Sequence, residues 1–169
     1  MGFGFIHIKG WKSFPIKTEK SEFIRKYIYF LEQELKSSAI HNVVVKDREV
    51  KFRAPIFRFV WNGWNRFNPV SRGEFHFRSI ANFGIVEYRI WFLEFFVLAL
   101  IFSIIPFFGI FPSLFWRIIA LLTIWIIYLI NILIATHRIE NYLGKLAHKL
   151  NKELQKPINR DIQFQKYNS

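Results

Sequence analysis

Cysteine is absent from this chain and acidic residues are scarce, which narrows the chemistry that the protein can perform. Without a thiol there is no disulfide framework, no thiolate metal site and no cysteine nucleophile. The histidines show no metal-ligand spacing with one another or with acidic neighbours. The sequence also lacks a Walker loop, a dinucleotide-binding fingerprint and a nucleophile elbow. We therefore predict no catalytic residues, no metal and no cofactor, and a protein that is not an enzyme.

Acidic side chains are half as numerous as basic ones, with 12 Asp and Glu against 24 Lys and Arg. Between Trp91 and Thr136 the only basic residue is Arg117, so the others flank an apolar region. This distribution follows the positive-inside rule, and we attribute most of the net charge of +12 to membrane topology. An anionic ligand or lipid headgroup is the alternative, and we do not expect nucleic acid as a partner. No signal peptide is expected, because the first ten residues include Lys9 and lack a long apolar core.

Long apolar runs occupy 91–111 and 113–136. About 20 helical residues cross the roughly 30 Å of membrane hydrocarbon, so each run is long enough to span. Breakers between them, at Pro106, Gly109 and Pro112, permit only a tight turn. We predict a transmembrane helical hairpin over 90–136 in an integral membrane protein. Both termini are expected on the cytoplasmic side, and a bacterial inner membrane is the simplest setting.

Polar residues inside the predicted hairpin are candidates for function, because intramembrane charges are costly. Arg117 lies near the outer boundary, where its side chain can reach the headgroups. Glu94 and Asn131 lie at similar depth near the inner boundary, and we predict that they face each other, a second copy or a partner. The alternative for Glu94 is an interfacial contact with Arg89 or His137.

Residues 1–89 predict a small cytoplasmic α+β domain, an antiparallel sheet with one helix in the order β-α-β-β-β-β. The helix is expected over 21–37, because its apolar residues form one stripe, with Thr18 or Ser21 as its N-cap. Six segments have strand character, one more than this order contains: 3–8, 42–46, 49–53, 56–61, 74–78 and 85–90. The last strand meets the first apolar run without a linker, which indicates a rigid join.

The segment 62–73 combines turn signals with aromatic and basic side chains. Its candidate binding residues are Trp64, Arg66, Phe67 and Arg72. Aromatic and basic groups together suit lipid headgroups, a protein surface or stacked bases. The alternative is that the aromatic side chains fold back and close one end of the sheet.

Residues 137–169 are predicted to continue the second apolar helix to about residue 155 and then to be extended or disordered. Ile139, Leu143, Leu146 and Leu150 recur at intervals of four and three, as in a short helix-pairing seam. The seam has three possible partners: the cytoplasmic domain, another copy of the chain, or the membrane surface.

These features favour a membrane-anchored interaction protein, or an accessory subunit of a larger membrane complex, whose soluble domain binds a partner at the cytoplasmic face. Self-association is also compatible with the seam. The first alternative is a homo-oligomeric channel or membrane-disrupting effector whose basic domain senses an anionic ligand. The second is a lipid-acting membrane enzyme or transporter subunit that uses Glu94.

Overall fold

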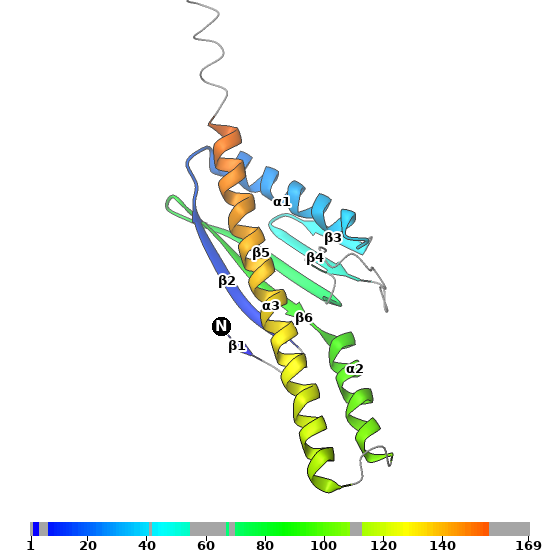
Figure 1. The fold of residues 1–169 in the computed structure, drawn as a ribbon. Helices are drawn as coiled ribbons and strands as arrows, with labels where there is room; N and C mark the ends of the chain where they lie inside the picture. The colour runs from blue at the N-terminus through cyan, green and yellow to red at the C-terminus, as the bar shows by residue number, and fades with distance from the viewer. Residues whose placement is uncertain are drawn as a thin grey trace, which may run out of the picture.

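A computed structural model of the chain describes residues 2–3, 7–40, 42–54, 67, 70–108 and 113–155. It has an α+β fold in which an antiparallel sheet is joined to a pair of helices that extend away from it (Figure 1). This confirms the predicted fold class at that level. The elements are β1 Gly2–Phe3, β2 His7–Pro15, α1 Lys20–Ser37, β3 Asn42–Lys46, β4 Glu49–Arg53, β5 Arg72–Ile80, β6 Phe83–Trp91, α2 Leu93–Ile104, the 3-10 turn η1 Ile105–Phe107 and α3 Leu114–Leu154.

The described strands form one sheet in the order β1-β2-β6-β5-β4-β3, and every neighbouring pair is antiparallel. The hairpin of β3 and β4 has the predicted bounds. Strands β5 and β6 contain the predicted strands 74–78 and 85–90 and extend beyond them at both ends. The predicted strand 3–8 is wrong in its bounds, because β1 ends at Phe3 and β2 runs on to Pro15 in continuous register with β6. The strand predicted at 56–61 lies outside the described residues.

Helix α1 buries the predicted apolar stripe against the sheet, with Tyr27, Leu31 and Leu35 fully buried. Its predicted N-cap is wrong: Glu19 occupies that position and makes no side-chain capping bond. The hydroxyl of Ser21 is instead engaged with the carboxylate of Glu19. Packing of the stripe, rather than a cap, therefore fixes where this helix lies.

One face of the sheet is covered by α1 and by the C-terminal half of α3 (Figure 1). The buried hydroxyl of Tyr27 on α1 donates to the backbone oxygen of Leu143 on α3 at 2.8 Å. Asn151 of α3 accepts from the backbone N–H of Lys17 at 3.1 Å and donates to the backbone oxygen of Pro15 at 2.7 Å. These bonds tie the end of α3 to the sheet and to α1.

The predicted pair of membrane-length helices is corrected by the structure. Within the described residues only α3, with 41 residues, is long and apolar enough to cross a membrane by itself, whereas α2 has 12 residues. Trp91 extends the β6 ladder instead of starting a helix. Pro106 lacks an N–H and clashes with a preceding helical carbonyl, which explains why α2 gives way to η1. The end of the predicted first helix, 109–111, lies outside the described residues.

Candidate functional site

The face of the sheet opposite α1 and α3 is not covered by any described helix, and alternation places charged side chains on it. The strand register sets one row of this face next to the start of α2. We call this the junction row, and it consists of His7, Asn42, Arg53, Arg72 and Trp91. The row carries two arginines and no carboxylate.

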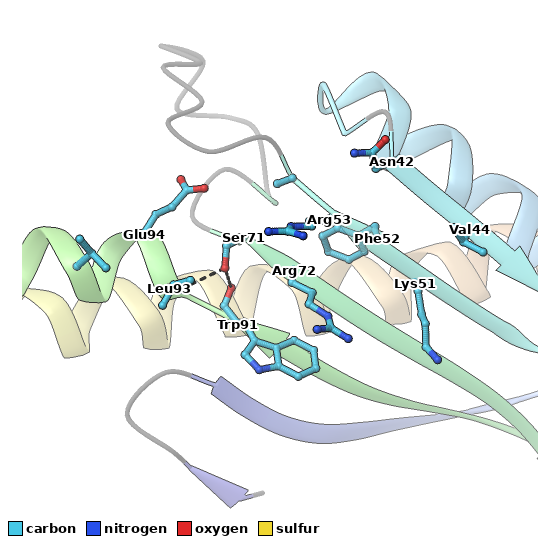
Figure 2. A pocket seen from close by; sticks show the side chains of 12 residues that line it. Asn42, Val44, Lys51, Phe52, Arg53, Ser71, Arg72, Trp91, Leu93 and Glu94 are labelled. Carbon is cyan, nitrogen blue, oxygen red and sulfur yellow. Dashed lines mark hydrogen bonds between the residues drawn. The ribbon is translucent and has the colours of Figure 1, made fainter.

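A cleft of about 800 Å³ lies between the junction row and the first turn of α2 (Figure 2). Its cationic lining comes from Lys51, Arg53 and Arg72 on β4 and β5. Its apolar lining includes Leu93 and Val97, which are exposed residues of α2. The remaining lining residues are Asn42, Val44, Phe52, Ala54, Ser71, Trp91 and Glu94. The cleft is therefore basic on the sheet side, whereas the helix side is apolar apart from the carboxylate of Glu94.

Ser71 fixes the geometry of the junction between the sheet and α2. Its hydroxyl donates to the backbone oxygen of Trp91 at 2.9 Å and accepts from the backbone N–H of Leu93 at 3.1 Å (Figure 2). Leu93 is the first residue of α2, so its N–H has no partner within the helix. Both hydrogen-bonding roles of this hydroxyl are structural, which argues against Ser71 as a nucleophile.

Trp91 lies at the edge of the cleft, close to two basic side chains. The Arg72 guanidinium carbon lies 4.9 Å from the Trp91 ring centroid, and that of Arg89 lies 5.8 Å from it. Both distances are within the range of cation–π contacts. Because Arg72 also binds Glu74 at 2.7 Å, its planar group has a defined orientation in the cleft.

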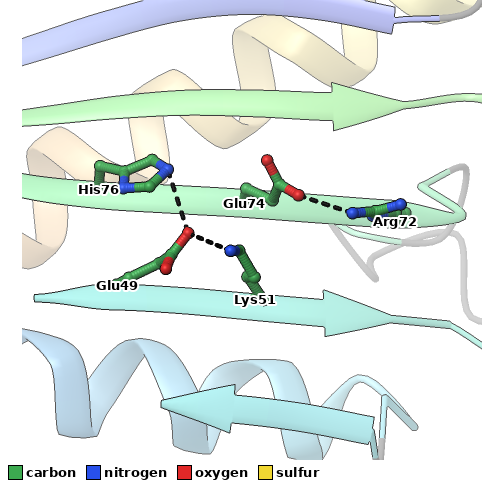
Figure 3. Close-up of polar contacts among 5 residues, drawn as sticks. All are labelled: Glu49, Lys51, Arg72, Glu74 and His76. Atoms are coloured by element: carbon green, nitrogen blue, oxygen red, sulfur yellow. Dashed lines mark hydrogen bonds and ion pairs between the residues drawn. The ribbon is translucent and has the colours of Figure 1, made fainter. Parts of the chain in front are cut away.

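Ion pairs organise the open face away from α2 (Figure 3). The Glu49 carboxylate binds Lys51 Nζ at 2.7 Å and His76 Nε2 at 3.2 Å. The hydrogen bond from Lys51 lowers the pKa of Glu49 below its usual value. Arg53 differs from its neighbours, because no carboxylate in the part of the chain that the structure describes lies within ion-pair distance of it.

The candidate binding residues of the segment 62–73 do not share one environment in the structure. Phe67 is fully buried, and its ring packs edge-on against Phe52, Phe75 and Tyr142. For Phe67 the structure thus has the alternative arrangement, in which the aromatic ring folds back onto the sheet. Arg72 belongs to β5 and lines the cleft. The other two candidates, Trp64 and Arg66, lie outside the described residues.

The polar residues of the apolar helices do not form one site. Glu94 lines the cleft, whereas Asn131 is exposed on α3 and donates to the backbone oxygen of Ile127 at 2.8 Å. The two therefore do not face each other as predicted, and contact with a second copy or partner stays a prediction. Arg117 is half-buried near the start of α3. Figure 1 shows that this helix begins far from the sheet.

The predicted seam lies against the chain's own sheet domain, the first of its three possible partners. Ile139, Leu143, Leu146 and Leu150 are all buried within the chain. Tyr88 strengthens this packing, because its hydroxyl donates to the carboxylate of Glu140 on α3. The seam is therefore part of the core that fixes the sheet relative to α3.

Sequence reasoning missed Arg53, Ser71 and Trp91 as members of one site. The alternation in β4 does put Arg53 on a polar face, but only the strand register places it beside Arg72 and Trp91. Comparison of the chain with protein-family models, with curated proteins and with solved structures found no match.

Proposed function

We propose that this protein is a membrane-anchored interaction protein, or an accessory subunit of a membrane complex. In this proposal α2 and α3 lie in the bilayer as a helical hairpin, with both chain ends on the cytoplasmic side. The open face of the sheet then lies at the membrane surface, where it binds a partner.

The observation that carries the proposal is that apolar side chains are exposed in the first half of α3 and buried in its second half. Its first half exposes large apolar side chains, whereas its second half buries its apolar stripe against the sheet. A soluble monomer rarely leaves so continuous an apolar surface in water. The exposed apolar residues of this half are Leu114, Phe115, Trp116, Ile118, Ile119, Leu122, Ile126, Ile127, Leu129, Ile130, Leu133 and Ile134.

The aromatic contacts between the helices support a paired hairpin. The ring of Phe96 on α2 lies 6.0 Å from Trp125 and 6.2 Å from Tyr128, both in edge-on geometry. Such contacts hold two helices together where lipid removes the hydrophobic drive for pairing. From Leu114 to Thr136 the apolar part of α3 measures about 35 Å at 1.5 Å per residue, enough to cross the hydrocarbon.

The connection to the sheet supports a role in presenting a surface. A single residue, Phe92, separates β6 from α2, and it is fully buried. On the other side, α3 passes from the apolar half to the sheet without a break. Two rigid connections hold the open face at a fixed height and orientation relative to the hairpin.

The membrane placement is tested with one substitution at two exposed isoleucines. Ile126 on α3 is 55% exposed and Ile80 in the sheet is 62% exposed. Lysine in the middle of a membrane helix costs about 2.5–3.5 kcal/mol, so Ile126→Lys should reduce the fraction of protein in carbonate-washed membranes. Ile80→Lys should leave that fraction unchanged. Equal behaviour of the two variants would refute the membrane placement.

Partner binding is tested by purification from the native membrane in mild detergent. The proposal expects another protein at fixed stoichiometry. A homogeneous ring of identical subunits would support the channel alternative instead, and a monomer without partners would refute the accessory role. The lipid-acting enzyme stays a prediction, for which Glu94→Gln must abolish a measurable lipid turnover.

A further inference from the structure

We propose that the cleft at the junction row binds the phosphate headgroup of an anionic phospholipid from the surrounding leaflet. This inference rests on the proposed membrane placement and names a ligand class for the open face. It is argued from the charge of the cleft, its apolar wall and its depth relative to the hairpin.

The basic side of the cleft is suited to a phosphate group. Arg53 and Arg72 are adjacent in the register, and Lys51 lies two residues before Arg53 on the same face of β4. Arginine presents paired N–H groups that match phosphate oxygens. Lys51 and Arg72 already hold carboxylates, whereas the guanidinium of Arg53 has none within ion-pair distance among the described residues. Arg53 is therefore the principal anion contact, and Arg72 supports it.

The apolar side of the cleft indicates which phosphate compound fits. Leu93 is 50% exposed and Val97 is 38% exposed, and both line the cleft from α2. Inorganic phosphate or a small polar phosphate ester would leave this wall in contact with water. An acyl chain that follows the surface of α2 would cover it, while the headgroup of the same molecule reaches the arginines. The ligand is thus charged at one end and apolar at the other.

The depth of the cleft matches the headgroup layer. Phe96 contacts Trp125 and Tyr128, and Leu93 precedes Phe96 by three residues. At 1.5 Å per residue, Leu93 lies about 4.5 Å nearer to the sheet, level with about residue 130 of α3. Trp91 of the junction row precedes Leu93 by two residues, which adds up to about 7 Å and brings the row level with about residue 135. The apolar run of α3 ends at Thr136, so the junction row lies at the boundary between the apolar and polar parts of α3, where a bilayer has its headgroups.

The carboxylate of Glu94 repels a bound phosphate, so removing this charge should strengthen lipid binding. Its carboxylate lines the same cleft from the first turn of α2, where the helix dipole favours a negative charge. Removing this charge leaves the cleft more positive. Glu94→Gln should therefore increase the retention of anionic lipid severalfold. A loss of retention in this variant would overturn the inference.

The principal experiment compares two double variants that remove the same charge. The test variant is Arg53→Gln with Arg72→Gln. The control is Arg48→Gln with Arg78→Gln, at the opposite end of the open face. Arg78 lies six residues from Arg72 along β5, or about 20 Å, which is about two Debye lengths at physiological salt. A headgroup at the junction row therefore interacts far less with the control pair.

Full-length protein is placed in nanodiscs of equal phosphatidylglycerol and phosphatidylcholine, and the lipids retained after release are counted by native mass spectrometry. Wild type should retain phosphatidylglycerol preferentially. Each basic residue at an anionic surface raises the binding affinity about fivefold. The test variant lacks two such residues, so its preference for phosphatidylglycerol should be about 25-fold lower than that of wild type. The control should stay within about twofold of wild type. Equal losses in both variants would overturn the inference.

Competition by glycerol phosphate at constant ionic strength identifies the source of the phosphate. If the competitor does not change the amount of retained lipid, the phosphate bound in the cleft belongs to a membrane lipid. Displacement at low competitor concentration would show a site for soluble phosphate compounds and overturn the commitment to lipid. Membrane fractionation of the same samples separates the two proposals. If wild type is in the membrane and only the lipid preference is absent, the headgroup inference alone fails.

Discussion

The hydroxyl of Tyr88 should contribute measurably to the free energy of unfolding, because it joins the sheet to α3. Tyr88 is 3% exposed, and its hydroxyl donates to the carboxylate of Glu140. A hydrogen bond to a charged acceptor contributes about 1.5–3 kcal/mol. Glu140 is half-buried and recovers some hydration when the donor is removed. We therefore expect Tyr88→Phe to lower the free energy of unfolding by about 1.5–2 kcal/mol.

The assay is equilibrium urea unfolding in nonionic detergent micelles, followed by tryptophan fluorescence. Tyr29→Phe is the matched control, because Tyr29 is 55% exposed. This substitution should change the free energy of unfolding by less than about 0.5 kcal/mol. Glu140→Leu completes a double-mutant cycle with Tyr88→Phe, and a coupling of about 1 kcal/mol or more is expected. Equal effects of Tyr88→Phe and Tyr29→Phe, with no coupling to Glu140, would refute the reasoning.

Three further variants and a series of pH values probe the same packing. Asn151→Leu should destabilise the fold by about 2–4 kcal/mol in the urea assay, because it leaves the backbone groups of Pro15 and Lys17 without partners. Gly10→Ala should cost about 1–3 kcal/mol, since a Cβ would lie 2.2 Å from the Tyr88 hydroxyl, whereas Gly144→Ala, with 3.5 Å to Lys12, should stabilise α3 by up to about 1 kcal/mol. Burial raises the pKa of Tyr27 and of Tyr88 above the ordinary tyrosine value. The contribution of these two tyrosines to stability should therefore be constant below about pH 10 and fall as the pH rises further, because only the unfolded tyrosines then ionise. Unfolding curves across this range should show a shallower fall for Tyr88→Phe.

Elements defined by neighbouring residues were predictable from the sequence. The hairpin 42–53 has two alternating strands around a short turn, and its observed bounds equal the predicted ones. Helix α1 begins one residue before its predicted start and ends at the predicted residue, and it was predictable because its apolar stripe is periodic through Leu35. Both patterns involve only neighbouring residues, so they can be recognised in the sequence without knowing what the elements pack against.

Elements defined by distant partners were not predictable. β2 carries Lys9, Lys12 and Ser13, and such polar residues weaken any strand signal in the sequence. Its length is set by nine register pairs with β6, far along the chain. Trp91 was assigned to a membrane helix because it is apolar, yet it pairs with His7 and Arg72. The cleft depends on the same register, so no local pattern could assemble it.

The sheet domain is completed only by α3, the last helix among the described residues. Residues of α3 bond to Tyr27 of α1, to Tyr88 of β6, and to Pro15 and Lys17 at the end of β2 and just after it. Helix α3 therefore supplies a large part of the sheet's cover. These contacts form only after the chain has passed through α2 and the apolar half of α3. Under the proposed membrane placement, the second apolar segment must return to the side of the membrane on which the sheet lies. Insertion of the hairpin and closure of the soluble core are then one cooperative event, since the returning half of α3 belongs to both. A charge placed in the apolar half should for this reason disturb the sheet as well as the anchor.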